Sequence, residues 1–534
     1  MKIKFLCLIL PFAYAISYSQ TTVGLLFNDL NVSEGYTLFT PQRNNEVFLM
    51  DNCGQKIHQW TFTETPGATC YLLPNSNLLR AGKDNLEIRD WSNNIIWSYP
   101  TTSNGIAQHH DIEPLPNGNI LCIVSDVYTL ANITAEGRNP AITDTTFKVD
   151  KIIELQPIGI NNANIVWEWK FIDHFIQDFD ATKQNYGIVQ NHPELLDINF
   201  VNNQIFDYTH LNAIDYNPNL DQIIISARHL SEVYIIDHST TTLQAASNTG
   251  GNSNKGGDFL WRWGNSQVYK QGTTVNQKLF LQHDCKWVET GYLDAGKISV
   301  FNNDGDGSGT FSSIHIISPE ILNGIYTKTN SIFNPQNFEF SWNGSILGTI
   351  VNEGKQSGVQ SLTNGNLLIC ETSSGRISEI TKTGTHLWSY KNPTGPIINS
   401  NYTIYTQNSS ISSNINGIFR AEKYPLTYAG FNNLILNSNG IIENSNTVSN
   451  ACITLNSDVF FKDEISVINP IKSTLLFNKK IENYKVTIYD SMGRIVFDQK
   501  SFTGDIININ LSSSIYFMHL TKDNIIKKYK LLVK

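Results

Sequence analysis

The sequence predicts an all-β protein, a six-bladed β-propeller followed by a small C-terminal β-sandwich. Six polar turns each split two apolar runs, and six short segments that contain tryptophan follow them, with a minimal repeat spacing of about forty residues. Only 16% of the 534 residues are charged. Asn, Ser, Thr and Ile are abundant, which is typical of strands and turns. A helical solenoid, the competing repeat architecture, would need a helical periodicity that the chain lacks.

The repeats can be placed in order along the chain. The turns read TPQRN (40–44), LPNSN (73–77), LPNGN (115–119), NPNLD (217–221), TGYLD (290–294) and LTNGN (362–366). The closing segments read KIHQW (56–60), NIIWSY (94–99), NIVWEW (164–169), FLWRW (259–263), FEFSW (338–342) and THLWSY (385–390). YPLTYAGF (424–431) finishes the propeller. We expect the first strand of each blade to line a central channel.

The domain organisation follows from the segments outside the repeats. Residues 1–20 have two lysines, a short apolar stretch and then small residues, which predicts a secretory signal peptide. We expect the propeller over 21–431 and an Asn- and Ser-rich linker over 432–457. A different strand pattern, with YKVTIYDSMGRIVF as its clearest part, predicts the β-sandwich over 458–534. His519 lies there between apolar residues and is expected to be structural.

Six cysteines follow the signal peptide, and none has the spacing of a metal site. Cys122 and Cys370 lie in apolar runs and are expected to be buried. Cys53 and Cys70 flank one short connection. The sequence leaves open whether these two form a disulfide in an oxidising compartment.

Three histidines indicate a site in the channel. His110, His210 and His283 each stand seven residues before one of the turns. Because strand side chains alternate, equal offsets predict three imidazoles at one level and in one direction. The same offset favours His110 over His109, which would then face into the blade. In the other blades it selects Gly35, Ala68 and Ser357.

Arg228 (IIISARHL) ends the second strand of the His210 hairpin and adds a permanent cation. Its guanidinium matches planar or tetrahedral oxyanions. Asp111 and Asp284 follow two of the histidines but are expected on the opposite face, which leaves no carboxylate in register. We therefore predict an electropositive site for an anion. The net charge of −9 argues against a general nucleic-acid binder.

The residues alone leave several chemistries open. Three imidazoles can bind zinc, but an arginine beside the metal is unusual, so we predict no metal and no cofactor. Channel histidines can also simply fill space. The remaining hypothesis is a neutral imidazole that accepts a sulfuryl or phosphoryl group covalently, and the spacing does not say which histidine does so. FNNDGDGSG (301–309) alternates oxygen side chains as calcium loops do, but a Gly-rich turn explains it equally well.

The sequence resembles the bacterial aryl-sulfate sulfotransferases over most of residues 34–431. The resemblance rests on QHHDIEPLPNGN, THLNAIDYNPNLDQIIISARHLSEVYIID, GDFLWRWGN, LFLQHD and FRAEKYPLTYAGF, and on the eighteen residues between His210 and Arg228. It implies a six-bladed propeller that moves a sulfuryl group from a phenolic sulfate ester to a phenol by a ping-pong, nucleotide-independent reaction. It also implies that His283 is the covalent acceptor, while His210, Arg228 and His110 bind sulfuryl oxygens and handle protons. The idiosyncratic QHDCKWVE around His283 leaves the substrate open.

The C-terminal segments ISVINP, VTIYDSMGRIVF, NLSSSIYFMHL and KKYKLLVK resemble the type A sorting domain of the type IX secretion system. The resemblance implies export across the outer membrane by that machinery, to the medium or the cell surface. An adhesion or carbohydrate-binding β-sandwich is the alternative. For the whole chain, the alternative to an enzyme is a catalytically silent surface propeller that binds a ligand or partner. A homodimer is among the oligomeric states left open.

Overall fold

The computed structural model describes residues 22–201, 206–443, 471–522 and 525–533, with single residues at 452, 465 and 467. The predicted signal peptide and much of the predicted linker lie outside the described residues. The chain divides into two compact units, Met1–Cys452 and Ile453–Lys534, which are described separately. No helix among the described residues is long and apolar enough to cross a membrane.

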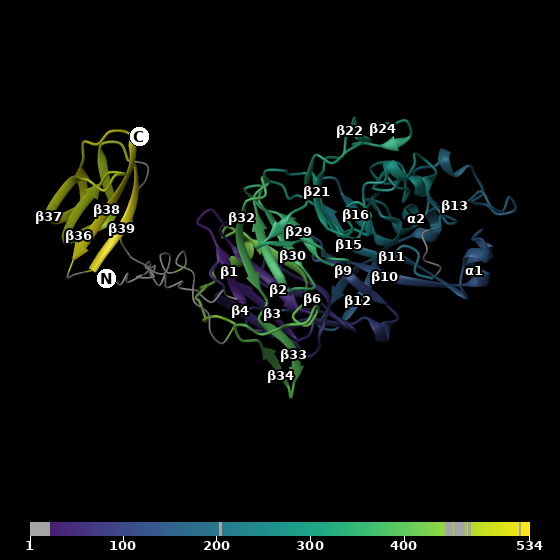
Figure 1. The fold of residues 1–534 in the computed structure, drawn as a ribbon, viewed down its shortest axis with the longest axis horizontal. Coiled ribbons are helices and arrows are strands. Elements are labelled where there is room, and N and C mark those ends of the chain that lie inside the picture. Colours follow the sequence, from purple (N-terminus) through teal and green to yellow (C-terminus); the bar gives the residue numbers. More distant parts are fainter. Residues whose placement is uncertain are drawn as a thin grey trace, which may run out of the picture. The chain divides into compact units, whose positions relative to one another are not determined.

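Six antiparallel sheets make the six blades of the propeller, so the predicted fold class is confirmed (Figure 1). Blade 1 contains β35 (Ile418–Tyr424), β2 (Tyr36–Pro41), β3 (Glu46–Met50) and β4 (Lys56–Thr61), from the channel outward. Blade 2 contains β5 (Pro66–Leu72), β6 (Leu78–Gly82), β7 (Asn85–Arg89) and β8 (Ile95–Pro100). Blade 3 contains β9 (Gln108–Pro114), β10 (Ile120–Thr129), β11 (Thr146–Ile158) and β12 (Asn162–Lys170).

The second half of the ring has the same plan. Blade 4 contains β15 (Leu211–Asn217), β16 (Gln222–Ala227), β17 (Glu232–Asp237) and β18 (Trp261–Trp263). Blade 5 contains β19 (His283–Trp287), β20 (Ile298–Asn302), β21 (Ser313–Ile317) and β26 (Phe340–Trp342). Blade 6 contains β29 (Gly358–Ser361), β30 (Leu367–Glu371), β31 (Arg376–Ile380), β32 (His386–Lys391) and, as a fifth strand, β1 (Gly24–Asn28). The strands β35, β5, β9, β15, β19 and β29 contact one another in that order and close a ring.

Short elements decorate the insertions between strands. They are α1 (Leu130–Ala135), α2 (Thr242–Ala245), β13 (Phe175–Ile176), β14 (Leu196–Asp197), β22 (Ile321–Leu322), β23 (Ile325–Tyr326), β24 (Lys328–Thr329), β25 (Ile332–Phe333), β27 (Ser345–Ile346), β28 (Thr349–Ile350), β33 (Thr394–Ile398) and β34 (Asn401–Ile404). Most lie in blades 3 to 5, where the sequence has its long insertions between repeats.

Blade 1 is completed by β35 from the far end of this unit, which pairs with β2 through Tyr36↔Tyr424 and Leu38↔Glu422. Gly35 therefore precedes the second strand of its blade, and the prediction that it lines the channel is wrong. The physical reason is that the turn after β2 joins the second and third strands, whereas the other five turns join the first and second. Ala68 lies in the innermost strand β5, and Ser357 immediately precedes the innermost strand β29.

The closing tryptophans join each blade to the next. Their indole N–H groups donate to backbone carbonyls as follows: Trp60 to Asp90 (3.0 Å), Trp97 to Asn162 (2.9 Å), Trp169 to Gly257 (2.8 Å), Trp261 to Asn334 (2.8 Å) and Trp388 to Asn52 (2.7 Å). Each acceptor belongs to the following blade, and the last bond runs from blade 6 to blade 1. An indole fills the interface between blades and also satisfies a backbone carbonyl there, which explains the recurring tryptophan.

Trp388→Phe is expected to destabilise the propeller by about 1–3 kcal/mol, because the ring stays apolar while the carbonyl of Asn52 loses its donor at the closure of the ring. Trp388 is fully buried. Urea unfolding measures the effect. Trp342→Phe is the comparison, since the half-buried Trp342 holds the same place in blade 5 without a described bond of this kind; an equal loss in both variants would contradict the explanation.

A disulfide joins Cys53 to Cys452, with a Cα–Cα distance of 5.6 Å, so the alternative of a Cys53–Cys70 bridge is wrong. Cys53 lies in the turn between β3 and β4, whereas Cys70 lies inside β5 and packs, as a free thiol, in the core between blades 1 and 2. Cys122 and Cys370 are free and buried, as predicted. The bridge fixes the end of the first unit to blade 1.

His58 in β4 is stacked on Trp91, with ring centroids 4.1 Å apart, and meets the edge of Trp60. Burial is the main cause that lowers its pKa to about 4, with Lys56 adding to it and a backbone hydrogen bond at Trp91 opposing it. Between pH about 6.5, the ordinary pKa of histidine, and pH about 4, the His58 imidazole binds a proton in the unfolded chain but not in the folded protein. Relative to His58→Phe, the wild type should therefore lose stability as the pH falls from about 6.5 to about 4. Urea unfolding across that range tests this, and a constant difference would contradict it.

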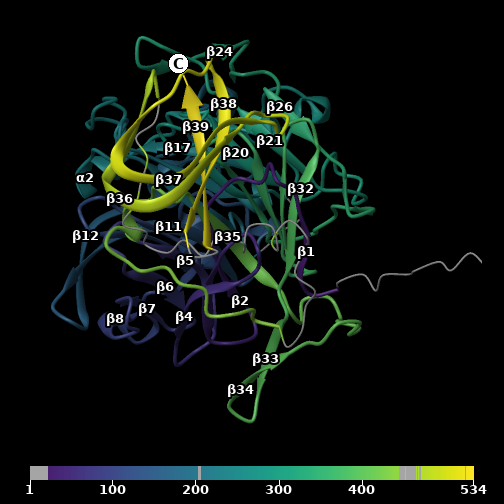
Figure 2. The same cartoon turned by 90° about the vertical axis from the view of Figure 1, so that its left-hand side faces the viewer.

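The second unit is an antiparallel sheet of four long strands in the order β37–β36–β38–β39. These are β36 (Thr474–Tyr489), β37 (Ile495–Asn508), β38 (Ser514–Lys522) and β39 (Ile525–Val533). Figure 2 shows that β36 and β37 curve strongly, and register shifts mark the bends. Val486, Met518 and Leu531 lie at the core of this domain. His519 lies on the other face of β38, against Tyr489.

Candidate functional site

The structure brings the three channel histidines together from neighbouring blades. His110 lies in β9, His210 immediately precedes β15, and His283 begins β19. The rings of His110 and His210 are 4.8 Å apart. The pKa of His110 is well below its ordinary value, first because of burial and then because of the charges of His109, His210 and His283. The three imidazoles therefore influence one another electrostatically at one place in the channel.

The backbone kinks beside each of these histidines. His110, His210 and Asp284 have positive φ angles of 58°, 49° and 52°, and the pairing of β9, β15 and β19 with the next strand shifts register there. Such bulges re-aim side chains and are common beside functional sites. Simple alternation therefore does not set the side-chain directions. His109 points toward β11, yet its Nδ1 remains 2.6 Å from Nδ1 of His110, so it belongs to the cluster.

The hydrogen bonds around His283 fix its tautomer. Its Nδ1 is 2.7 Å from Oδ1 of Asn303, and the amide of Asn303 donates to the carbonyls of Glu353 (2.8 Å) and Gln356 (2.9 Å). Since both amide hydrogens are used, Oδ1 accepts, and Nδ1 of His283 must carry the proton. Nε2 then holds a lone pair, which accepts the backbone N–H of Gln356 at 3.1 Å.

His283 is also kept neutral. Its side chain is only 1% exposed, and burial is the main reason that its pKa lies well below the ordinary value. The hydrogen bond that Nδ1 of His283 donates to Asn303 opposes this shift, while the charges of Arg228 and Arg420 add to it. The buried imidazole therefore presents an unprotonated Nε2 near neutral pH.

Asn303 belongs to the stretch FNNDGDGSG, for which calcium was one explanation. Asp304 accepts the N–H of Gly309, and Asp306 accepts the N–H of Ser308 at 3.0 Å. These carboxylates thus hold the turn of their own loop, and the loop positions Asn303 against His283. The residue was missed as a site residue because the pattern around it is that of a turn.

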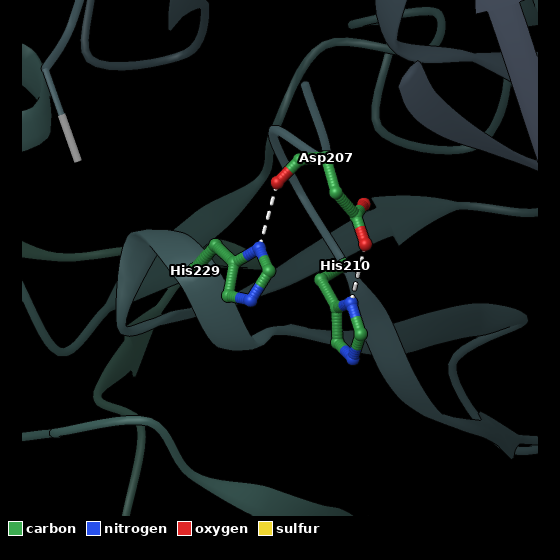
Figure 3. Close-up of side chains that lie close together, drawn as sticks. All are labelled: Asp207, His210 and His229. Carbon is green, nitrogen blue, oxygen red and sulfur yellow. Dashed lines mark hydrogen bonds and ion pairs between the residues drawn. The ribbon is translucent and has the colours of Figure 1, made fainter. Parts of the chain in front are cut away.

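His210 is held by a carboxylate that the sequence reasoning missed (Figure 3). Its Nδ1 lies 2.6 Å from Oδ2 of Asp207, and Lys148 Nζ lies 3.1 Å from the same oxygen. Burial raises the pKa of Asp207, but His210 and Lys148 outweigh it and lower the pKa to about 2. The prediction of no carboxylate in register with the histidines concerned the repeat offset, and Asp207 lies beside His210 outside that offset. Asp207 stands on the loop before β15, outside the repeat offset, and only its position three residues before His210 could have indicated it.

His229 completes this group, with Nδ1 2.6 Å from the backbone oxygen of Asp207. Ligand atoms of Asp207, His210 and His229 all lie within 4.8 Å of one another, the distance range of a metal cluster. Both Nδ1 atoms already bond to Asp207, and Lys148 neutralises its carboxylate. Protein contacts account for the geometry, so we interpret the group as a support for His210.

Arg228 follows β16 and adds a second cation near this group, beside Lys148. Its Nη2 lies 3.5 Å from the carbonyl of Gly354, in the loop that also contacts His283 through Gln356. Within the described part of the chain it has no carboxylate at ion-pair distance, unlike Arg262 with Glu232. Its half-buried guanidinium is therefore available to an anion beside His283.

A layer of buried charge underlies the histidines. Arg420 of β35 bonds Asp111 of blade 3 and forms an ion pair of 3.0 Å with Asp284 of blade 5, while its Nη2 donates to the carbonyl of Asn212 in blade 4 at 2.8 Å. Asp111 and Asp284 thus face away from the histidines, as expected, and bind one arginine across the channel. The layer ties the closing strand to the three blades that carry the site.

Fold and site together define a β-propeller whose channel holds a cluster of buried and half-buried histidines with Arg228 near them. Residues 28–315 match the arylsulfotransferase (ASST) family, and residues 469–534 match the secretion system C-terminal sorting domain. The chain belongs to the arylsulfotransferase family, and its sorting domain marks it for secretion or the cell surface. The matched range contains His110, His210, Arg228 and His283.

Other comparisons add little. A search among curated proteins finds no match. Similar solved structures include a protein of unknown function from Bacteroides caccae, with 12% identity, 67% of this chain and 94% of that chain covered, and a TM-score of 0.36. A catalytically inactive virginiamycin B lyase from Staphylococcus aureus has 9% identity, 73% and 96% coverage, and a TM-score of 0.33. At these TM-scores the similarities carry no argument.

Proposed function

We propose that this protein is an exported aryl-sulfate sulfotransferase that works by a ping-pong mechanism. It takes the sulfuryl group of a phenolic sulfate ester onto His283 and passes it to a phenolic acceptor, without a nucleotide or a metal. Family membership supports the reaction class. The observation that carries the mechanism is the hydrogen bond between Nδ1 of His283 and Oδ1 of Asn303, which leaves Nε2 without a proton.

His283 differs from the other two histidines in the group that is hydrogen-bonded to its Nδ1. An amide, Asn303, backs His283, whereas carboxylates back His210 directly and His110 through His109. A carboxylate favours the imidazolium form much more strongly than a neutral amide does. His283 therefore keeps an unprotonated Nε2, whose lone pair can exchange the N–H of Gln356 for sulfur, while the other histidines suit proton transfer and charge stabilisation.

The groups around Nε2 of His283 suit a sulfuryl group in the transition state of its transfer. Arg228, His210 and His110 would bind its equatorial oxygens, whose charge grows in the transition state. The N–H of Gln356 marks the direction of the Nε2 lone pair. As sulfur bonds to Nε2, this N–H is free to turn to a sulfuryl oxygen.

Purified protein should transfer sulfate from 4-nitrophenyl sulfate to phenol with no added nucleotide and in the presence of a chelator. Release of 4-nitrophenol that depends on phenol, with phenyl sulfate as the second product, is the expected result. Release of 4-nitrophenol that does not depend on phenol and gives no phenyl sulfate would indicate a hydrolase. Loss of activity on adding the chelator would indicate a metal enzyme.

The alternative is a catalytically silent propeller that binds a ligand or partner at the cell surface. Intact mass after brief incubation with an aryl sulfate distinguishes the two. A gain of one sulfuryl group that disappears on adding phenol supports the enzyme, and an unchanged mass supports the binder.

A further inference from the structure

A chain of hydrogen bonds leads from the site into blade 3. Nδ1 of His110 lies 2.6 Å from Nδ1 of His109, and Nε2 of His109 lies 2.9 Å from Oδ1 of Asp150 in β11. We propose that His109, paired with Asp150, stores the proton of the reaction between its two halves and exchanges it with substrate through His110. This inference rests on the proposed sulfotransferase function and adds two positioning residues to it.

The surroundings of Asp150 stabilise its ionised carboxylate. It is fully buried, and its Oδ2 accepts the N–H of Leu211 (2.6 Å) and the hydroxyl of Thr209 (2.8 Å) while Oδ1 faces His109. Burial raises the pKa of Asp150, but the charge and bond of His109, with Leu211 and Lys148, lower it overall. A buried carboxylate holds the Nε2 proton of His109 and stabilises a second proton on that ring.

The contact between His109 and His110 defines two states. Two nitrogens 2.6 Å apart can share only one proton. In the loaded state, His109 is an imidazolium that donates to His110, and His110 carries its own proton on Nε2, toward the site. In the empty state, His109 is neutral, and His110 carries its proton on Nδ1 and a lone pair on Nε2. His110 is neutral in both states, which agrees with its depressed pKa.

The two states balance the two half-reactions. In the first, Nε2 of His283 attacks sulfur, the sulfur–aryloxide bond breaks, and the aryl oxygen keeps the electron pair. It takes the Nε2 proton of His110 while the Nδ1 proton of His109 moves to His110. In the second, the acceptor oxygen attacks sulfur, the sulfur–nitrogen electron pair returns to His283, and the acceptor proton reloads His109 through His110.

The pair His210–Asp207 does not fit this role. Lys148 shares the charge of Asp207, and the chain ends at a single imidazole. The ring of His229 lies 4.4 Å from that of His210, but its Nδ1 faces the backbone oxygen of Asp207, and among the described residues no hydrogen bond joins the two imidazoles. We therefore assign the Asp207 pair to holding His210 in place and the Asp150 pair to proton storage.

The wild-type protein allows a direct test. Phenyl sulfate is mixed with excess protein in weakly buffered indicator at a pH of about 6, at which an imidazole holds a second proton and a phenol, with a pKa of about 10, is fully protonated. A stored proton predicts a burst of phenol with no proton taken from solution. Uptake of one proton per phenol in the burst would overturn the proposal, whereas absence of any burst would instead contradict the proposed function.

Variants give a second test that depends on the leaving group. His109→Asn keeps an oxygen where Nδ1 accepts from His110 but cannot store a proton. Sulfation of His283 by phenyl sulfate should slow by about 10²–10⁴-fold. Sulfation by 4-nitrophenyl sulfate, whose phenolate leaves unprotonated, should slow much less. Asp207→Asn is the comparison, and it should slow the sulfation of His283 by the same factor with both donors.

An equal loss with both donors in His109→Asn would overturn the proposal, because it would indicate a purely structural role. Where this variant does not fold, the proton measurement on the wild type still decides.

Discussion

His283→Asn is expected to abolish sulfuryl transfer, with kcat/KM for 4-nitrophenyl sulfate reduced by at least about 10⁴-fold. The amide side chain is close in size and polar, but it has no nucleophilic nitrogen, so no covalent intermediate can form. Arg228 and the other histidines would then face the sulfuryl group without a group to accept it. Initial rates with phenol as the acceptor measure the loss.

The matched control is His315→Asn. His315 lies in blade 5 as His283 does, is 5% exposed, and bonds Ser313 and Ser341 by its two ring nitrogens. Its variant tests whether removing any buried histidine of this blade impairs the protein. Comparable losses in both variants, or substantial activity in His283→Asn, would contradict the assignment.

Arg420→Met is expected to give the largest loss of stability, about 3–5 kcal/mol. The substitution leaves Asp111 and Asp284 buried without the cation that they share, and it removes the donor to Asn212. The closing strand would lose its ion pairs with Asp111 of blade 3 and Asp284 of blade 5 and its bond to blade 4, while Glu422 would still pair with Lys286 of blade 5. Chemical unfolding monitored by tryptophan fluorescence measures the change.

Two comparisons make this prediction specific. Lys423→Met removes a buried cation from the same strand, but within the described part of the chain this cation pairs with Glu379 alone, so the loss of stability should be smaller. Adding Asp111→Asn and Asp284→Asn to Arg420→Met should recover part of the stability, because the unpaired charges are gone. If the variant with all three substitutions were less stable to unfolding than Arg420→Met alone, the account of the charged layer would be contradicted.

The propeller could be predicted because its signals repeat. The tryptophans of the closing segments recur since each fills the same interface, and five of them donate to the next blade. Gly35 was misplaced because blade 1 is completed by a strand nearly four hundred residues away. The Cys53–Cys452 bridge spans a similar separation and leaves no local pattern.

The site was only half visible in the sequence. His110, His210 and His283 shared an offset from turns, and Arg228 ended a neighbouring strand. Asp207, Asp150 and Asn303 support them but lie on a loop, a third strand and a turn, where no repeat marks them. Spacing also could not rank the histidines. The structure adds a physical reason for choosing His283, namely the amide behind it, which supports the role implied by the family resemblance.

The position of the covalent sulfate tests the central proposal most directly. Wild-type protein is incubated briefly with 4-nitrophenyl sulfate without acceptor, kept at alkaline pH to preserve a sulfo-imidazole, digested and sequenced by mass spectrometry. We predict one sulfuryl group on His283 that is lost when phenol is added before digestion. A sulfuryl group on His110, His210 or any other residue would contradict the proposal. So would an unmodified protein that has released 4-nitrophenol in stoichiometric amount.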